Sequence, residues 1–99
     1  MIYYSRSGTI APGKTAAALS FSREIAAHIK GKTGMDIRVG VPVGGNPQRI
    51  GWFMNFANLA ALEEMQVALT QDQQYMDIVK RSGDNFVAGS FHDEIWRIA

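Results

Sequence analysis

The chain of 99 residues is long enough for one domain, residues 1–99, and leaves little room for a second. Hydrophobic residues make up 46% and charged residues 19%, a balance that excludes a disordered chain. The net charge is +1, and basic and acidic residues are spread along the whole sequence. Most nucleic-acid-binding proteins instead concentrate Lys and Arg on one face, so we expect no nucleic-acid partner.

Cysteine is absent, which excludes a disulfide framework, a thiolate nucleophile and a cysteine-based zinc site. No apolar run approaches the ~20 residues that a membrane helix needs. Residues 1–6 lack the basic start and the long apolar stretch of a signal peptide. We therefore expect a cytoplasmic protein without a membrane partner.

The first two predicted elements are a strand and a helix. Residues 2–10 combine β-branched, aromatic and small side chains without a helical period, which predicts a strand. Its middle, Ser5–Gly8, is polar, which suggests an irregular strand or a sheet edge. Residues 14–30 predict a helix, because apolar side chains recur at spacings of three and four along one stripe: Ala18, Phe21, Ile25 and Ile29.

Glycines are expected to end this helix, at Gly31 and Gly34. Residues 37–43 then alternate between valine or isoleucine and other residues, which predicts a second strand. Residues 44–48 are turn formers, so a hairpin should lead into a third strand, residues 49–56. This third strand is the most apolar run of the chain, with large side chains on both faces.

The last part of the chain predicts two helical pieces and a strand. Asn58 is a suitable N-cap for a helix whose apolar face holds Leu59, Leu62, Met65 and Leu69. Thr70 and Gln73 have the spacing of a capping box, which indicates a break and a second helical start. Residues 86–98 return to a strand pattern, with a shift in phase that suggests a bulge near Gly89.

The order β-α-β-β-α-β predicts an α+β, ferredoxin-like fold, with an antiparallel sheet and the helices on one face. The other sheet face would then carry an apolar patch that is larger than a soluble monomer usually exposes. A homodimer that stacks two such sheets into an α/β barrel would bury this patch. The predicted interface residues are Tyr3, Phe53 and Phe91, with Val87 beside them.

The segment Gly8–Thr15 matches the phosphate-binding pattern G-x-x-x-x-G-K-[ST] letter for letter. Pro12 removes one of the backbone N–H groups that such a loop aims at phosphate. Phosphate-loop enzymes also need a parallel sheet and a magnesium-binding Asp at a strand end, and neither is predicted here. We therefore interpret the segment as a Pro-Gly turn that leads into a helix.

RNA binding through the sheet is a weaker alternative. The RNA-recognition motif shares the predicted element order and has the central-strand pattern K/R-G-F/Y-G/A-F-V-x-F/Y. Residues 49–56 meet it at Arg49, Phe53 and Phe56 but place Gly51 where a stacking aromatic is required.

Histidine occurs only twice, at His28 and His92. His28 borders the apolar stripe of the first helix. His92 is followed by Asp93 and Glu94, but alternation sends Asp93 to the opposite sheet face. We therefore expect no metal site.

The chain as a whole resembles the dimeric α/β-barrel superfamily of ferredoxin-like proteins, of the antibiotic-biosynthesis-monooxygenase-like and stress-responsive kind. The features that carry the resemblance are Pro12–Lys14 before the first helix, Thr33–Gly34 after it, Gly44–Gly45 in the hairpin and Trp52 in the third strand. The resemblance implies a barrel of two subunits and a pocket between sheet and helices. Members include cofactor-independent monooxygenases, small-molecule isomerases and haem-handling enzymes, and no catalytic residue can be assigned from the resemblance.

We therefore expect a homodimer that binds a small, fairly apolar molecule without a cofactor. It could act as a cofactor-independent monooxygenase. The predicted pocket residues are Trp52, Asn55, His92 and His28. The alternative is a non-catalytic structural or interaction module whose barrel serves dimerisation alone.

Overall fold

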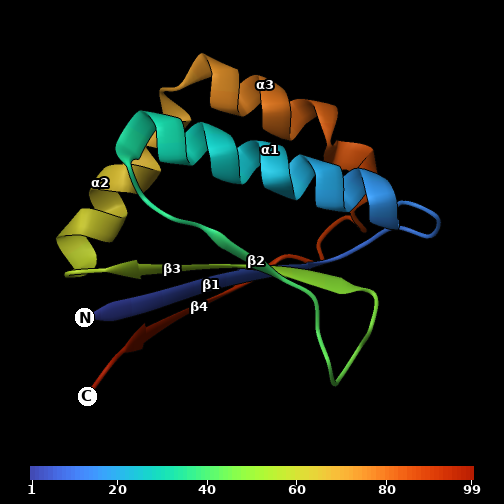
Figure 1. Ribbon diagram of the computed structural model, residues 1–99, viewed down its shortest axis with the longest axis horizontal. Coiled ribbons are helices and arrows are strands. Elements are labelled where there is room, and N and C mark those ends of the chain that lie inside the picture. The colour runs from blue at the N-terminus through green and yellow to red at the C-terminus, as the bar shows by residue number, and fades with distance from the viewer.

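A computed structural model describes residues 1–99. It contains four strands, three α-helices and a 3₁₀ turn: β1 (Ile2–Thr9), α1 (Thr15–Thr33), β2 (Arg38–Gly40), β3 (Arg49–Phe56), α2 (Leu59–Thr70), α3 (Gln73–Arg81), η1 (Gly83–Asn85) and β4 (His92–Arg97). The strands form one antiparallel sheet in the order β2-β3-β1-β4. The helices all cover one face of this sheet, and the other face is open (Figure 1). The predicted ferredoxin-like α+β fold is confirmed.

Strand β1 lies at the centre of the sheet, paired with β3 on one side and β4 on the other. The expectation of an edge position was therefore wrong. Residues directly opposite each other in an antiparallel pair point to the same face. The even-numbered positions of β1 and β3 consequently face the helices, and the odd-numbered positions face outward.

Helix α1 begins after a Pro12–Gly13 turn, in which Gly13 has a φ of +76°. It ends at Gly34, whose left-handed conformation lets its N–H donate to the Lys30 carbonyl. Gly34 is thus the predicted C-cap, whereas Gly31 stays inside the helix. None of the three α-helices is long and apolar enough to cross a membrane.

The second helical region is divided as predicted, but by a different cap. Asn58 caps α2 by accepting a hydrogen bond from the Ala61 N–H at 2.9 Å. Asp72 caps α3 and accepts from the Tyr75 N–H at 3.1 Å. The capping box expected at Thr70 is absent, because its hydroxyl donates to the carbonyl of Val67 in the last turn of α2.

Both outer strands are shorter than predicted. Strand β2 ends at Gly40; Pro42 lacks the N–H that would extend a ladder, and Val43 is fully exposed. Before β4 the chain makes a turn at Gly89, with a φ of +76°, rather than the expected bulge. The Ser90 hydroxyl closes this turn by donating to the Val87 carbonyl at 2.6 Å.

The core between sheet and helices has two parts. The larger one contains Ile2, Tyr4, Ile25, Ile29, Met54, Phe56, Leu62, Met65, Leu69 and Ile78. The smaller one lies at the other end of the sheet and contains Ile10, Ala18, Ile50, Trp52 and Phe86. Phe21 and Ile37 pack against both. Side chains of both parts line the cavity described next.

Candidate functional site

A cavity of about 840 Å³ lies between the helix-covered face of the sheet and the three helices. This volume is within the range of ligand pockets for small molecules, roughly 300–1,000 Å³. Hydrophobic side chains supply 13 of its 19 lining residues. Strand β4 forms the open side, since all six of its residues are exposed and the helices leave it uncovered.

Aromatic rings form one end of the cavity. Phe21 from α1, Trp52 from β3, and Phe86 and Phe91 from the segment before β4 lie within 5.2–6.4 Å of their neighbours, centroid to centroid. Phe91 stacks on Trp52 at 6.1 Å and 24°. Its expected position on the open sheet face was therefore wrong, because the turn at Gly89 shifts the phase of the chain before β4 begins.

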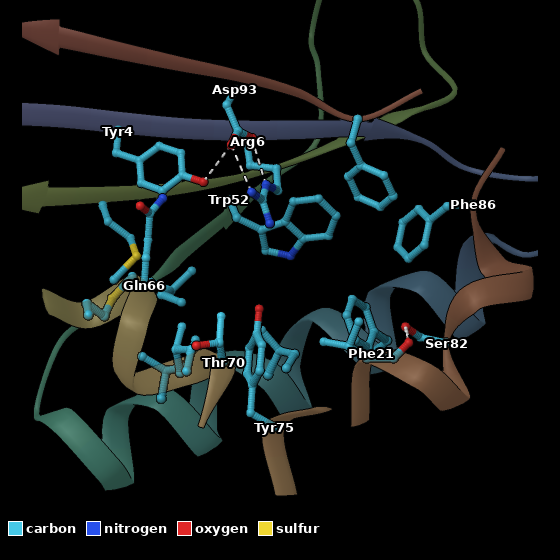
Figure 2. A pocket seen from close by; sticks show the side chains of 18 of the residues that line it. Tyr4, Arg6, Phe21, Trp52, Gln66, Thr70, Tyr75, Ser82, Phe86 and Asp93 are labelled. Carbon is cyan, nitrogen blue, oxygen red and sulfur yellow. Dashed lines mark hydrogen bonds and ion pairs between the residues drawn. The ribbon is translucent and has the colours of Figure 1, made fainter. Parts of the chain in front are cut away.

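The polar centre of the cavity is a group of three side chains on β1 and β4, which we call the Arg6 triad: Tyr4, Arg6 and Asp93 (Figure 2). Arg6 and Asp93 form a bidentate pair, with Nε–Oδ1 at 2.6 Å and Nη2–Oδ2 at 2.8 Å. The Tyr4 hydroxyl donates to the same Oδ2 at 2.9 Å. The register explains the grouping, because Arg6 and Asp93 are directly opposite each other in the sheet.

The triad sets the protonation states at this site. The Arg6 guanidinium lowers the pKa of Asp93, and the Tyr4 hydroxyl adds to this effect. Burial raises the pKa of Tyr4 to about 12, although the positive charge of Arg6 opposes the shift. Hydrogen bonding to Asp93 raises the pKa of Arg6. At neutral pH the site therefore holds one balanced ion pair and a neutral phenol.

Two further polar groups point into the cavity without a partner. The Trp52 side chain is only 9% exposed, and its buried Nε1–H makes no hydrogen bond. Tyr75 rises from α3 with its hydroxyl directed toward Trp52 and Arg6 (Figure 2). Burial raises the pKa of Tyr75, so its hydroxyl stays protonated and available as a donor.

Of the four predicted pocket residues, only Trp52 lines the cavity. Asn55 is exposed on the open sheet face, opposite Tyr3, because β3 keeps an unbroken register. His92 is also on the open face, where its Nε2 lies 3.1 Å from a carboxylate oxygen of Glu94. These two placements were wrong, and the physical reason is the strict alternation of side chains along a strand.

His28 was also placed wrongly, and it has a structural role instead. Its Nε2 lies 2.7 Å from Oδ2 of Asp72, the N-cap residue of α3, and the two side chains are only 8% and 13% exposed. This contact joins the C-terminal half of α1 to the start of α3. His28 thus fixes the arrangement of two helices over the sheet, and it does not line the cavity.

The residues that the sequence reasoning missed are Arg6, Asp93, Tyr4 and Tyr75. A signal for Arg6 is present in the sequence, since it interrupts an apolar series at alternate positions of the first strand. A lone charged residue on the inward face of a strand indicates a buried partner or a ligand. Alternation correctly separated Asp93 from His92 and Glu94, but the choice of His92 as a pocket residue put Asp93 on the wrong face.

The sequence matches no protein-family model and no curated protein. Its fold is similar to that of solved structures. One is a NIPSNAP family protein from Agrobacterium tumefaciens, with a TM-score of 0.83 and 20% identity over 99% of this chain and 92% of that one. Another is an uncharacterised NIPSNAP domain protein from Burkholderia xenovorans, with a TM-score of 0.84 and 14% identity over 100% of this chain and 95% of that one.

An antibiotic biosynthesis monooxygenase is also similar, with a TM-score of 0.74 and 12% identity over 100% of this chain and 99% of that one. Identities this low establish a common fold and leave the chemistry open. The chain therefore has the ferredoxin-like fold that is found in NIPSNAP proteins and in antibiotic biosynthesis monooxygenases, and the resemblance in the sequence implied the second of these.

Proposed function

We propose that this protein binds a small, mainly apolar molecule in the cavity between its sheet and helices. The observation that carries the proposal is an aromatic cavity of about 840 Å³, in whose wall the buried Trp52 Nε1–H has no hydrogen-bond partner. A buried donor without a partner costs roughly 1–3 kcal/mol. A ligand with one acceptor group and an apolar body would recover this cost and cover the ring cluster.

A fluorescent probe tests the proposal. N-phenyl-1-naphthylamine is neutral and apolar, and it becomes bright when it leaves water. We expect saturable binding by the wild-type protein. Val79→Phe should reduce the affinity roughly tenfold or more by placing a ring in the cavity. The matched control is Val67→Phe on α2, an exposed residue that does not line the cavity. Absence of saturable binding, or equal affinities of the two variants, would favour the structural or interaction module.

A cofactor-independent monooxygenase is the catalytic version of this proposal, and the likeness in fold to an antibiotic biosynthesis monooxygenase supports it. Such a reaction needs a base that removes a proton from the substrate. Asp93 is the one carboxylate that lines the cavity, and its lowered pKa makes it a weak base. Neither histidine faces the cavity. We therefore rank binding above oxygenation.

Oxygen uptake separates the two versions. With 1,4-dihydroxynaphthalene as an oxidisable apolar phenol, we expect the same rate of oxygen consumption with and without the protein. An acceleration that Asp93→Asn removes would instead establish the catalytic version.

We also propose that the protein is a homodimer through its open sheet face. Tyr3 and Phe53 stack there at 6.3 Å and 13°, and the Phe53 ring lies flat over Gly40 and Gly51. The same face carries Arg38 on β2 and Glu94 on β4, at opposite edges of the sheet. A two-fold axis parallel to the strands would place β2 of one subunit over β4 of its partner, which would pair these opposite charges.

A further inference from the structure

Three donor groups of the cavity converge from β1, β3 and α3, and none of them has a protein acceptor. Arg6 uses its Nε and Nη2 on Asp93, and no protein atom accepts from its Nη1. This nitrogen points toward the indole of Trp52, and the Tyr75 hydroxyl approaches the same space from α3 (Figure 2). A guanidinium and an indole N–H can only donate. A cation at this point would therefore face the like charge of Arg6.

The number of these donors favours one class of acceptor. A carbonyl oxygen offers two lone pairs, whereas a carboxylate offers about four and accepts from an Arg fork with two parallel bonds. The Nη1 and Nη2 edge of Arg6 remains open to a second carboxylate, because Asp93 occupies the Nε and Nη2 edge. Trp52 and Tyr75 would supply the third and fourth hydrogen bonds.

The surroundings keep the cost of a second negative charge moderate. Asp93 is already neutralised by Arg6, and the two side chains are 37% and 44% exposed. The triad thus lies near the open β4 side of the cavity, where water still reaches a bound anion. The apolar body of the same ligand would extend inward, against the ring cluster around Trp52.

We propose that the ligand is an apolar carboxylic acid, bound as its anion to the free edge of Arg6, the Trp52 N–H and the Tyr75 hydroxyl. This inference rests on the proposed function and adds the chemical class of the ligand. Asp93 and Tyr4 act as positioning residues that hold the guanidinium in place.

The test compares two ligands of the same shape, 2-naphthylacetate and 2-naphthylacetamide, by displacement of N-phenyl-1-naphthylamine at pH 7. We expect the acid to bind roughly tenfold or more tightly than the amide, because charge-assisted hydrogen bonds are about twice as strong as neutral ones. Trp52→Phe and Tyr75→Phe should each reduce the affinity for 2-naphthylacetate roughly tenfold. The affinity for 2-naphthylacetamide should fall much less. Because the amide has the same shape as the acid, its affinity shows how much of the loss comes from a change in cavity shape.

Tyr3→Phe on the open sheet face removes a hydroxyl outside the cavity and should leave both affinities unchanged. Equal affinities of acid and amide, or no displacement by the acid, would overturn the carboxylate proposal. Saturable binding of the neutral probe in that same experiment would leave the proposed function standing. Loss of probe binding in the wild-type protein would overturn both.

Discussion

Arg6 shows how one side chain can be both a structural and a binding element. It stands in the central strand at a position that faces the helices, where an apolar residue would fill the core. The bidentate pair with Asp93 satisfies one edge of the guanidinium, and partial exposure limits the desolvation cost. An exposed pair of this kind contributes little to stability, about 0–1 kcal/mol. Its position is therefore better explained by the cavity than by the fold.

The contact between His28 and Asp72 has the opposite character, because both side chains are largely shielded from water and neither lines the cavity. The hydrogen bond with His28 and the donated N–H of Tyr75 lower the pKa of Asp72 below its ordinary value of 3.8. A carboxylate whose pKa is lowered by folding stabilises the fold at pH values above its ordinary pKa. This contribution is lost as the pH falls through the pKa of the folded state.

We therefore expect Asp72→Asn to lower the melting temperature at pH 7, because the amide keeps the cap but loses the charge beside His28. The difference from wild type should shrink as the pH is lowered below about 4, where the wild-type carboxylate becomes protonated. Calorimetry at several pH values measures this difference, and Asp72→Ala, which also loses the cap, should be the less stable variant throughout. A difference that stays constant from pH 7 to pH 2 would show that the charge of Asp72 is unimportant.

At the scale of the elements, the predictions that hold are those that depend on local interactions. Asn58 could be identified as a cap because its acceptor serves an N–H only three residues away. Gly34 could be identified because only its own left-handed conformation is needed. Strand β1 was misjudged because its partners are distant in sequence, and the partner of Arg6 can be identified only once β4 is placed.

The site itself was less predictable than the fold for the same reason. Trp52 was identified because a large aromatic residue in an apolar strand is conspicuous in the sequence. Tyr75 and Asp93 belong to elements whose phase depends on the Asp72 cap and on the turn at Gly89. The sequence does not show which side chains of these elements face the cavity, so neither residue could be assigned to it. His92 was therefore chosen in place of Asp93.

Helix α1 permits a direct test of how closely it packs on β3. Ala18 is fully buried in the smaller part of the core, whereas Ala27 is exposed on the same helix. Ala18→Leu should destabilise the protein by about 1–3 kcal/mol through overpacking. The matched Ala27→Leu should change stability by less than about 0.5 kcal/mol. Urea unfolding measures both, and equal values would mean that α1 can move away from the sheet at little cost.

At the scale of the whole molecule, the two faces of the sheet have different surroundings. One face is covered by the helices and holds the cavity, and the other carries the aromatic stack of Tyr3 and Phe53 without a cover. Trp96, on the same open face, is 57% exposed. Contiguous apolar patches of this kind mark interaction sites in soluble proteins. A dimer would cover this face and leave the helix-side cavity of each subunit in place.

Phe53→Asp tests that assembly. In a face-to-face dimer the new carboxylate would be buried beside its two-fold mate without a partner, so we expect dissociation to monomers or loss of folding. Val43→Asp places the same charge on the fully exposed hairpin and should leave the assembly unchanged. Light scattering at micromolar concentration gives the mass, and circular dichroism separates dissociation from unfolding. A wild-type mass of one chain, or a Phe53→Asp variant that remains a stable dimer, would exclude Phe53 from the interface and make the open face available to a different partner.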